Sequence, residues 1–401
     1  MRAGHALTTY GGGHCVPFWN LYLWGMWAEG CNCASTVYHI PYIPLHGGAA
    51  PKEWALQLQV CVRETHSGRA WPSQSSPCAR LPKQDRVQVP PEMAERGLPA
   101  LAADLAAGTA AGACHRLRQA AAAGARELAR MVRRGPSAPR HVAVTPGALP
   151  ALVAGGAAGA AAPTASLRAA ACSSALALSE IAWADPELAR CVAETPGALP
   201  ALIATLAAGC AAATPSLQGA AADSAVALAE IASAGPDVAR CVLEVPRALA
   251  ALVAALAAGT ASANANLQLM ATNSVQVLAQ IGAGDQELAR QVADVPGALA
   301  ALVAATAAGA AARANSLQQG AAMCSTAVLA MIARADPGLT RRAAEMPGAL
   351  ASLAAAVAAG GAAAPSSLQN VAANSTVVLS GIVRAGPELA RRAAEAPGVL
   401  A

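Results

Sequence analysis

The chain repeats itself every 50 residues over most of its length, with one inserted residue. A proline followed by a leucine-rich run begins at Pro146, Pro196, Pro246, Pro296 and Pro347, as in PGALPALV and PGALPALI. Arginines at 190, 240, 290, 341 and 391 keep the same spacing, as do leucines at 167, 217, 267, 317 and 368. A fixed period of this length predicts a solenoid, in which each repeat packs only on its neighbours.

Each copy has the pattern of three helices. In residues 235–284, a short helix starts at Gly235-Pro236 and ends before a second proline. A second helix, PRALAALVAALAAG, follows and is expected to stop at Gly259. After a polar linker comes a longer third helix, whose buried face is predicted to comprise Leu267, Ala271, Ser274, Leu278 and Ile281, at helical spacing. With 55% hydrophobic but only 3% aromatic residues, much of it alanine, the composition favours an all-α fold.

The runs PGALPALIATLAAG (196–209) and LQGAAADSAVALAEIA (217–232) resemble the armadillo repeat. The resemblance covers residues 97–401 and implies a right-handed superhelical solenoid of about six three-helix repeats. The period exceeds the usual length of about 42 residues, and we expect the excess in the linker between the second and third helices. The family implies a non-catalytic scaffold of the cytoplasm or nucleus, which binds a protein or an extended peptide in a concave groove lined by the third helices.

By this resemblance, positions equivalent to 223, 226 and 230 line the groove. Nuclear-import adaptors carry tryptophan and asparagine at the last two, and this sequence does not, so we do not expect it to bind nuclear-localisation signals. The expected groove residues are Arg126, Arg130, Ser173, Glu180, Asp223, Glu230, Asn273, Gln276, Gln280 and Asn374. The Asn and Asp side chains either hydrogen-bond a peptide backbone or bond to nearby helix carbonyls and water.

The order of charges along the groove suggests a ligand. Arg126 and Arg130 are helical neighbours in the first repeat, and Glu180 and Glu230 follow one and two repeats on. A peptide with an acidic segment and a basic or polar continuation matches this order. In the alternative, the arginines form a solvated cap, since terminal repeats need a polar outer surface.

Two further ladders are interpreted as structural. The serines at 174, 224, 274, 325 and 375 lie on the buried stripe, where a small residue lets helices approach closely. The arginine ladder of the first helix either caps that helix's own C-terminal carbonyls or covers apolar surface with its aliphatic stem.

Catalysis, cofactors and metals are not expected. No Lys follows residue 83, and no Cys or Ser has an identifiable paired base. Cys31-Asn-Cys33, with Cys15 and histidines nearby, has a shorter spacing than a zinc site prefers, so we predict no metal. From residue 91 the chain carries 20 Arg against 19 Asp and Glu, a balance that argues against nucleic acid as the main partner.

Residues 1–90 differ in composition from the repeat domain, 91–401. We expect this segment to be mostly irregular, with a short helix near Trp54–Val62. Its aromatic run Phe18–Trp27 suggests an alternative function, a membrane-peripheral organiser anchored there. Neither a transmembrane helix nor a clear signal peptide is expected. The last repeat breaks off at Ala401, which predicts an exposed apolar edge, and hence either self-association or a truncated gene.

Overall fold

A computed structural model describes residues 36–39, 57–60 and 97–396, apart from 111, 162–163, 284, 313–314 and 362–363. The chain divides into two units, Met1–Ser73 and Gln74–Ala401. In the first unit, β1 (Thr36–His39) pairs antiparallel with β2 (Gln57–Val60). The helix expected near residues 54–62 is therefore wrong, because QLQV alternates polar and apolar residues as a strand does. The aromatic run, the Cys31–Cys33 group and the boundary at residue 90 lie outside the described residues.

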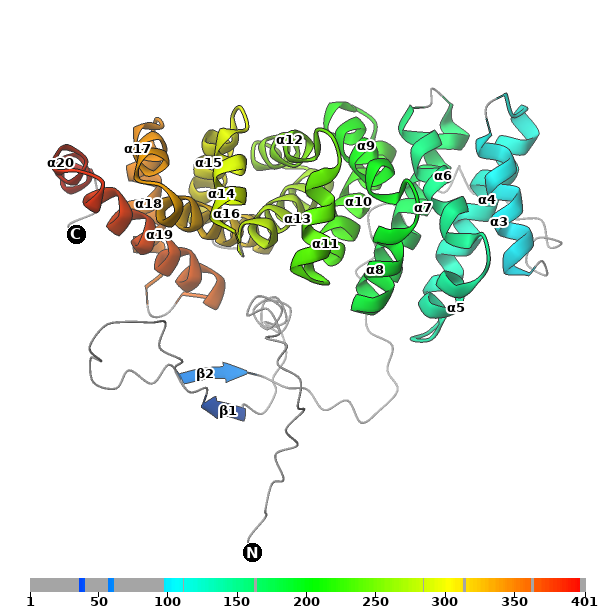
Figure 1. The fold of residues 1–401 in the computed structure, drawn as a ribbon, viewed down its shortest axis with the longest axis horizontal. Coiled ribbons are helices and arrows are strands. Elements are labelled where there is room, and N and C mark those ends of the chain that lie inside the picture. Colours follow the sequence, from blue (N-terminus) through cyan, green and yellow to red (C-terminus); the bar gives the residue numbers. More distant parts are fainter. Residues whose placement is uncertain are drawn as a thin grey trace, which may run out of the picture. The chain divides into compact units, whose positions relative to one another are not determined.

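The described part of the second unit is all-helical and repeats a three-helix motif (Figure 1). The first helices are α5 (Ala138–Val144), α8 (Pro186–Glu194), α11 (Pro236–Glu244), α14 (Gln286–Asp294), α17 (Pro337–Glu345) and α20 (Pro387–Glu395). The second are α3 (Leu98–Thr109), α6 (Ala148–Ala161), α9 (Ala198–Ala211), α12 (Ala248–Thr260), α15 (Ala298–Ala311) and α18 (Ala349–Ala359). The third are α4 (His115–Val132), α7 (Ala165–Ala184), α10 (Pro215–Ser233), α13 (Ala265–Gly282), α16 (Ser316–Ala335) and α19 (Ser366–Arg384).

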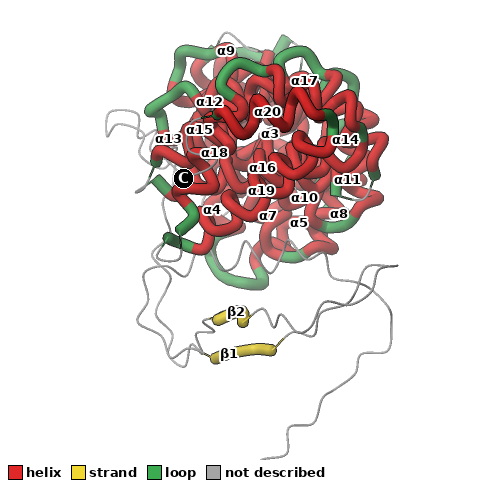
Figure 2. The backbone as a smooth tube through the Cα atoms, turned by 90° about the vertical axis from the view of Figure 1, so that its left-hand side faces the viewer, coloured by secondary structure: helices red, strands yellow, loops and turns green. Residues whose placement is uncertain are grey.

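The helices stack in rows. Each third helix packs on the third helices before and after it, and the second helices form a parallel row beside them. The first helices lie mainly against the third helices. Seen along the stack, α17, α14, α11 and α8 follow one another around one side (Figure 2). This arrangement confirms the predicted all-α solenoid.

The core is a continuous seam of alanine and branched aliphatic side chains. On α10, Leu228 and Ile231 are fully buried, and Leu278 and Ile281 take the same places on α13. The serine ladder lies inside this seam with no exposed surface, and none of its hydroxyl oxygens has a hydrogen-bond partner among the described residues. The ladder therefore acts as a row of small packing residues, as its place on the stripe predicts.

A left-handed residue makes the sharp turn between the first and second helices. Gly147, Gly197, Gly297 and Gly348 have φ between 76° and 81°. This conformation costs free energy for a residue that has a Cβ. Arg247 stands at the equivalent turn with φ 67°. The two helices then cross at 90°, 90°, 95° and 93° in the four repeats from α5–α6 to α14–α15.

Gly259 does not end its helix, contrary to the prediction. It lies within the last turn of α12, and a Cβ there would overlap the carbonyl of Leu267 and the methyl of Ala271 on α13. The equivalent glycines, at 108, 159, 209, 309 and 360, meet the same obstruction. Glycine is needed here because the second and third helices nearly touch backbone to backbone.

Glutamines join successive linkers between the second and third helices. The amide of Gln268 donates to Ser262 O at 2.8 Å, and its oxygen accepts from Asn315 Nδ2 at 3.0 Å. Gln218 makes the same pair of bonds with Ala212 O and Asn264, each at 2.9 Å. Gly259 lies against the carbonyl of Leu267, and the equivalent Gly309 lies against the carbonyl of Gln318, which is one residue further along its repeat. The inserted residue therefore lies in the linker after α15.

Among the described helices, α16 alone is long and apolar enough by itself to cross a membrane. Of its most apolar 18-residue window, 72% is buried within the molecule, so packing against neighbouring helices accounts for that composition. Four bent pairs of first and second helices also pass the same test when each is taken as one span.

Candidate functional site

One side of the third-helix row is open to solvent. On α7, Leu176, Glu180 and Trp183 are at least partly exposed, whereas Leu178 and Ile181 on the opposite stripe are buried. The positions equivalent to 180 and 183 are at least partly exposed on every third helix, whereas the positions equivalent to 173 and 176 are both buried on α16, at Cys324 and Ala327. We call these positions, equivalent to 173, 176, 180 and 183, the third-helix face. All ten predicted groove residues lie at these positions.

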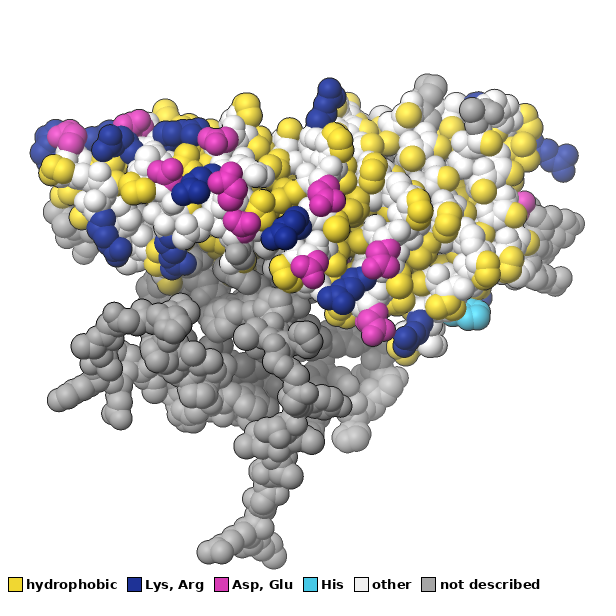
Figure 3. Space-filling view, in the orientation of Figure 1, with side chains coloured by type: hydrophobic (Ala, Val, Ile, Leu, Met, Phe, Trp, Pro, Cys, Tyr) yellow, Lys and Arg dark blue, Asp and Glu magenta, His cyan; other side chains and the backbone are white. Residues whose placement is uncertain are grey.

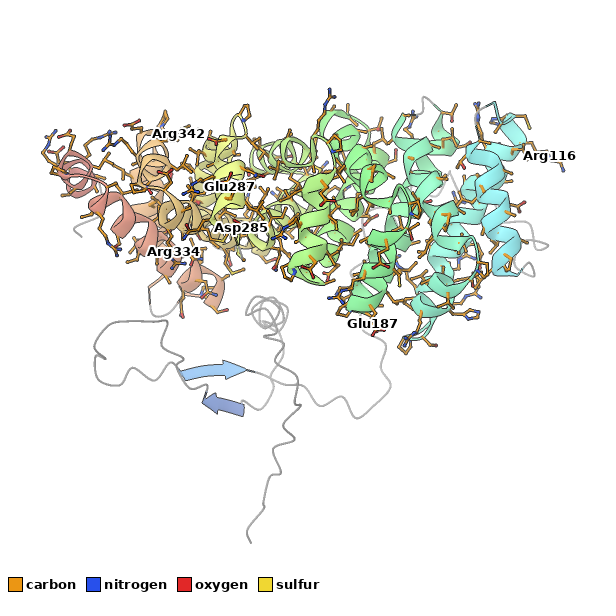
Figure 4. The ribbon with its side chains drawn as sticks, viewed as in Figure 1. Arg116, Glu187, Asp285, Glu287, Arg334 and Arg342 are labelled. Carbon is orange, nitrogen blue, oxygen red and sulfur yellow. The ribbon has the colours of Figure 1, made fainter. Side chains whose placement is uncertain are left out.

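Several charged side chains of the first helices form ion pairs. Dark blue and magenta side chains alternate over this face of the molecule (Figure 3). Arg342 pairs with Asp294 at 2.7 Å, and Arg290 lies 3.3 Å from Glu287 and 3.8 Å from Asp336. Arg342 and Glu287 are labelled in Figure 4. These pairs are exposed and contribute little stability each.

Three arginines of the ladder, Arg190, Arg290 and Arg341, donate to the carbonyl end of a helix other than their own. Arg190 on α8 donates to Ala234 O at 3.1 Å, at the end of the third helix in the same repeat. Arg290 makes the equivalent bond to Ala335 O at 3.1 Å. Of the two structural alternatives for this ladder, capping of the first helix is wrong for these arginines, since their side chains reach across to the carbonyl ends of α10 and α16.

Most charged groups at the first-repeat end of the third-helix face are already engaged. Arg130 and Arg134 both bond to the buried carboxylate of Glu127, at 2.7 and 2.9 Å. Arg133 bonds to Glu180 at 2.7 Å, across the boundary between α4 and α7. A buried carboxylate needs such partners, which explains why the arginines cluster here. Arg126 makes no ion pair with any described residue.

Glu230 is the unpaired carboxyl of the face. It lies on α10, mostly covered, and no cation of the described chain bonds to it. Burial raises the pKa of its carboxyl from 4.5 to about 7. Charge on this group therefore changes near neutral pH, and a cationic ligand group placed beside it would favour the ionised form.

The remaining polar groove residues differ in their exposure and hydrogen bonding. Asn273 donates to Leu269 O at 2.8 Å, so it bonds to its own helix, as the structural alternative predicts. Asp223 and Gln276 are buried, with 4% and 7% exposure, so they are not available for first contact with a ligand. Small residues let the third helices pack closely enough to cover the side chains of Asp223 and Gln276. Ser173, Gln280 and Asn374 remain partly exposed.

The predicted groove residues leave out the next exposed position along each third helix. The next position after 180 is Trp183, whose side chain is 69% exposed at the end of α7. At the equivalent places stand Arg133, Ser233, Ala283, Arg334 and Arg384. The spacing that placed Glu180 on the face also places Trp183 there, so the signal was present in the sequence.

No group of three or more His, Cys, Asp or Glu side chains suited to a metal ion occurs in the part of the chain that the structure describes. The buried thiols are also poorly suited to chemistry. Burial raises the pKa of Cys324 to about 12 and that of Cys210 to about 11, so both stay protonated at neutral pH.

Comparison with known proteins supports the fold. No family model matches the chain, and no curated protein matches it. An engineered protein solved by the Northeast Structural Genomics Consortium is similar over 70% of this chain and 97% of its own, with 20% identity and a TM-score of 0.50. A second engineered protein from that consortium has 17% identity and a TM-score of 0.37, over 76% and 74% of the two chains. The repeat unit is thus an all-α helical repeat solenoid.

Proposed function

We propose that the repeats are armadillo-like and that the chain is a non-catalytic scaffold of the cytoplasm or nucleus. Its third-helix face binds a protein or an extended peptide. The three-helix motif, with the short first helix bent about 90° from the second, supports this assignment over two-helix repeats.

Trp183 is the observation that carries the proposal. It is the most exposed large apolar side chain among the described residues, and it lies on the same face as Glu230 and Arg126, which lack ion-pair partners. Tryptophan and arginine dominate the binding energy of protein interfaces when a partner covers them. A face that exposes a tryptophan and carries charged groups without ion-pair partners is suited to a partner that covers the tryptophan and pairs with those groups.

The charge pattern narrows the expected ligand. Of the two predicted groove arginines, Arg130 is held by Glu127, so Arg126 is the one that can meet an acidic group of a ligand. Glu230, two repeats on, suits a basic or polar group. The proposed peptide therefore keeps the predicted polarity, with fewer first-repeat contacts than the sequence indicates.

The test replaces Trp183 by alanine and measures the affinity of a partner captured by the full chain. Loss of an interface tryptophan costs about 2 kcal/mol, so we expect affinity to fall about 30-fold. Val144→Ala is the matched control, because Val144 is 67% exposed on the first helix α5. Equal affinities for the Trp183 variant and the unchanged protein would exclude the third-helix face around α7.

Two further proposals stand beside this one. The membrane-peripheral organiser depends on Phe18–Trp27, outside the described residues, and flotation with liposomes, with and without residues 1–90, tests it.

Self-association is supported by Val357 and Val383 in the last repeat, which are 37% and 49% exposed. A sedimentation profile showing only monomer would contradict it.

A further inference from the structure

A pocket of about 610 Å³ lies where the last two third helices meet the first helix between them. Its walls come from α16, α17 and α19, and Val377 and Gly381 form part of the third-helix face. Gly381 takes the position held by Arg130, Glu180, Glu230, Gln280 and Met331 in the other repeats. A Cβ at Gly381 would lie 3.2 Å from the Cβ of Ala333, so the glycine lets α19 lie close to α16 at this wall of the pocket.

The available polar groups of the pocket are almost all cationic or donors. Arg334 makes no ion pair or hydrogen bond with any described residue, and it lies beside α19 (Figure 4). Arg384 donates to Ser380 Oγ at 2.8 Å, which leaves the serine proton and the other guanidinium protons free. No Asp or Glu lines the pocket. The nearby Asp336 already accepts from the amide of Gly338 and pairs with Arg290.

Helix ends alone do not explain these arginines. A cation in the last turn of a helix complements the roughly −0.5 charge of the helix end. The equivalent positions hold Trp183, Ser233 and Ala283 in three repeats, and Arg133, which pairs with Glu180, in a fourth, so the fold does not require a cation there. The two arginines carry two positive charges, whereas the ends of the two helices together contribute about one negative charge. The pocket is therefore net positive.

We propose that this pocket binds the oxyanion of a bound peptide, either a side-chain carboxylate or a phosphate. Arg334 and Arg384 approach it from adjacent helices, and Ser380 donates a third hydrogen bond. Planar guanidinium groups match both oxyanions, and their charge-assisted bonds are stronger than neutral ones. This assignment rests on the proposed peptide-binding function and locates an anchor for an acidic residue at the last repeats.

The first test uses inorganic phosphate and the full chain. Thermal unfolding is followed while phosphate replaces chloride at constant ionic strength. We expect phosphate to stabilise the unchanged protein and its apparent affinity to fall at least tenfold in Arg334→Gln/Arg384→Gln. The control, Arg116→Gln/Arg247→Gln, loses the same charge outside the pocket and should respond like the unchanged protein. An equal response from all three proteins would overturn the site.

The second test distinguishes the source of the oxyanion. Degenerate decapeptide pools carry glutamate, phosphoserine or glutamine at one fixed position. We expect at least tenfold tighter binding of one anionic pool over the glutamine pool, lost in the pocket variant and kept in the control. Equal retention of the three pools would overturn the peptide assignment. If phosphate binds but no pool does, the oxyanion site stands and the proposed peptide-binding function fails.

Discussion

Arg247 holds a left-handed conformation that glycine holds in the equivalent turns. Its φ of 67° compares with 79° at Gly197 and 81° at Gly297. A side chain in this region costs about 1–2 kcal/mol, and the extra freedom of an unfolded glycine offsets part of that amount. We therefore expect Arg247→Gly to stabilise the protein by about 0.5–1 kcal/mol, measured by urea unfolding. Gly197→Ala should shift the midpoint in the opposite direction, and a lower midpoint for Arg247→Gly would contradict this account.

Glu230 makes stability depend on pH. Its pKa is raised to about 7 in the folded protein, so the folded state binds more protons than the unfolded state between pH 4.5 and 7. Stability contributed by the protonated carboxyl is therefore present at low pH and is lost as pH rises through 7. We expect Glu230→Gln to stabilise the protein by on the order of 1–3 kcal/mol at pH 8 and little at pH 4.

The measurement is the urea midpoint of the unchanged protein and of Glu230→Gln across this pH range. Glu244→Gln serves as the control, because Glu244 is an exposed carboxyl on the first helix α11. If both variants follow the same pH profile as the unchanged protein, burial of Glu230 does not perturb its titration.

At the scale of helices, contact between the second and third helices of a repeat depends on one glycine. A methyl group at position 209 would overlap the methyl of Ala221, and it would lie 2.7 Å from the carbonyl oxygen of Leu217. We expect Gly209→Ala to destabilise the protein by about 1–3 kcal/mol, because α9 and α10 must separate.

Gly156→Ala is a matched control for that substitution. Gly156 is also buried inside a second helix, but a methyl there meets only Thr205 Oγ1, at 3.9 Å. Alanine favours the helix by about 1 kcal/mol over glycine, so this variant should gain stability. Thermal or urea unfolding compares the two, and a similar gain in both would show that the close approach at Gly209 is absent.

The elements themselves were predictable because local patterns determine them. The short helix expected over residues 236–245 is α11 (Pro236–Glu244), and four of the five residues of the expected stripe on α13 are fully buried. Contacts between repeats were not predictable in the same way. Pairing of Arg133 with Glu180 and burial of Gln276 depend on how far adjacent helices rotate and approach, which periodicity does not specify. The role of Gly259 was missed for the same reason, since its obstruction comes from α13.

At the scale of the whole molecule, the third-helix face combines unpaired charged groups with an exposed tryptophan. On the first helices, most arginines pair with acidic residues or cap the third helix of their own repeat, whereas Arg240 and Arg392 do neither among the described residues. On the third-helix face, Arg126, Glu230 and Arg334 have no ion-pair partner among the described residues, and Trp183 is exposed. Unused charge and an exposed tryptophan on one continuous face are the basis for assigning binding to that face.

Site-specific photo-crosslinking tests this assignment most directly. A benzophenone amino acid replaces Leu176, Val226 or Val377 on the third-helix face, or Cys191 or Gln291 on the first helices, each in the full chain. After illumination with a bound partner, we expect crosslinks from the first three positions and none from the other two. Crosslinks confined to positions 191 and 291 would place the partner on the opposite surface and contradict the account.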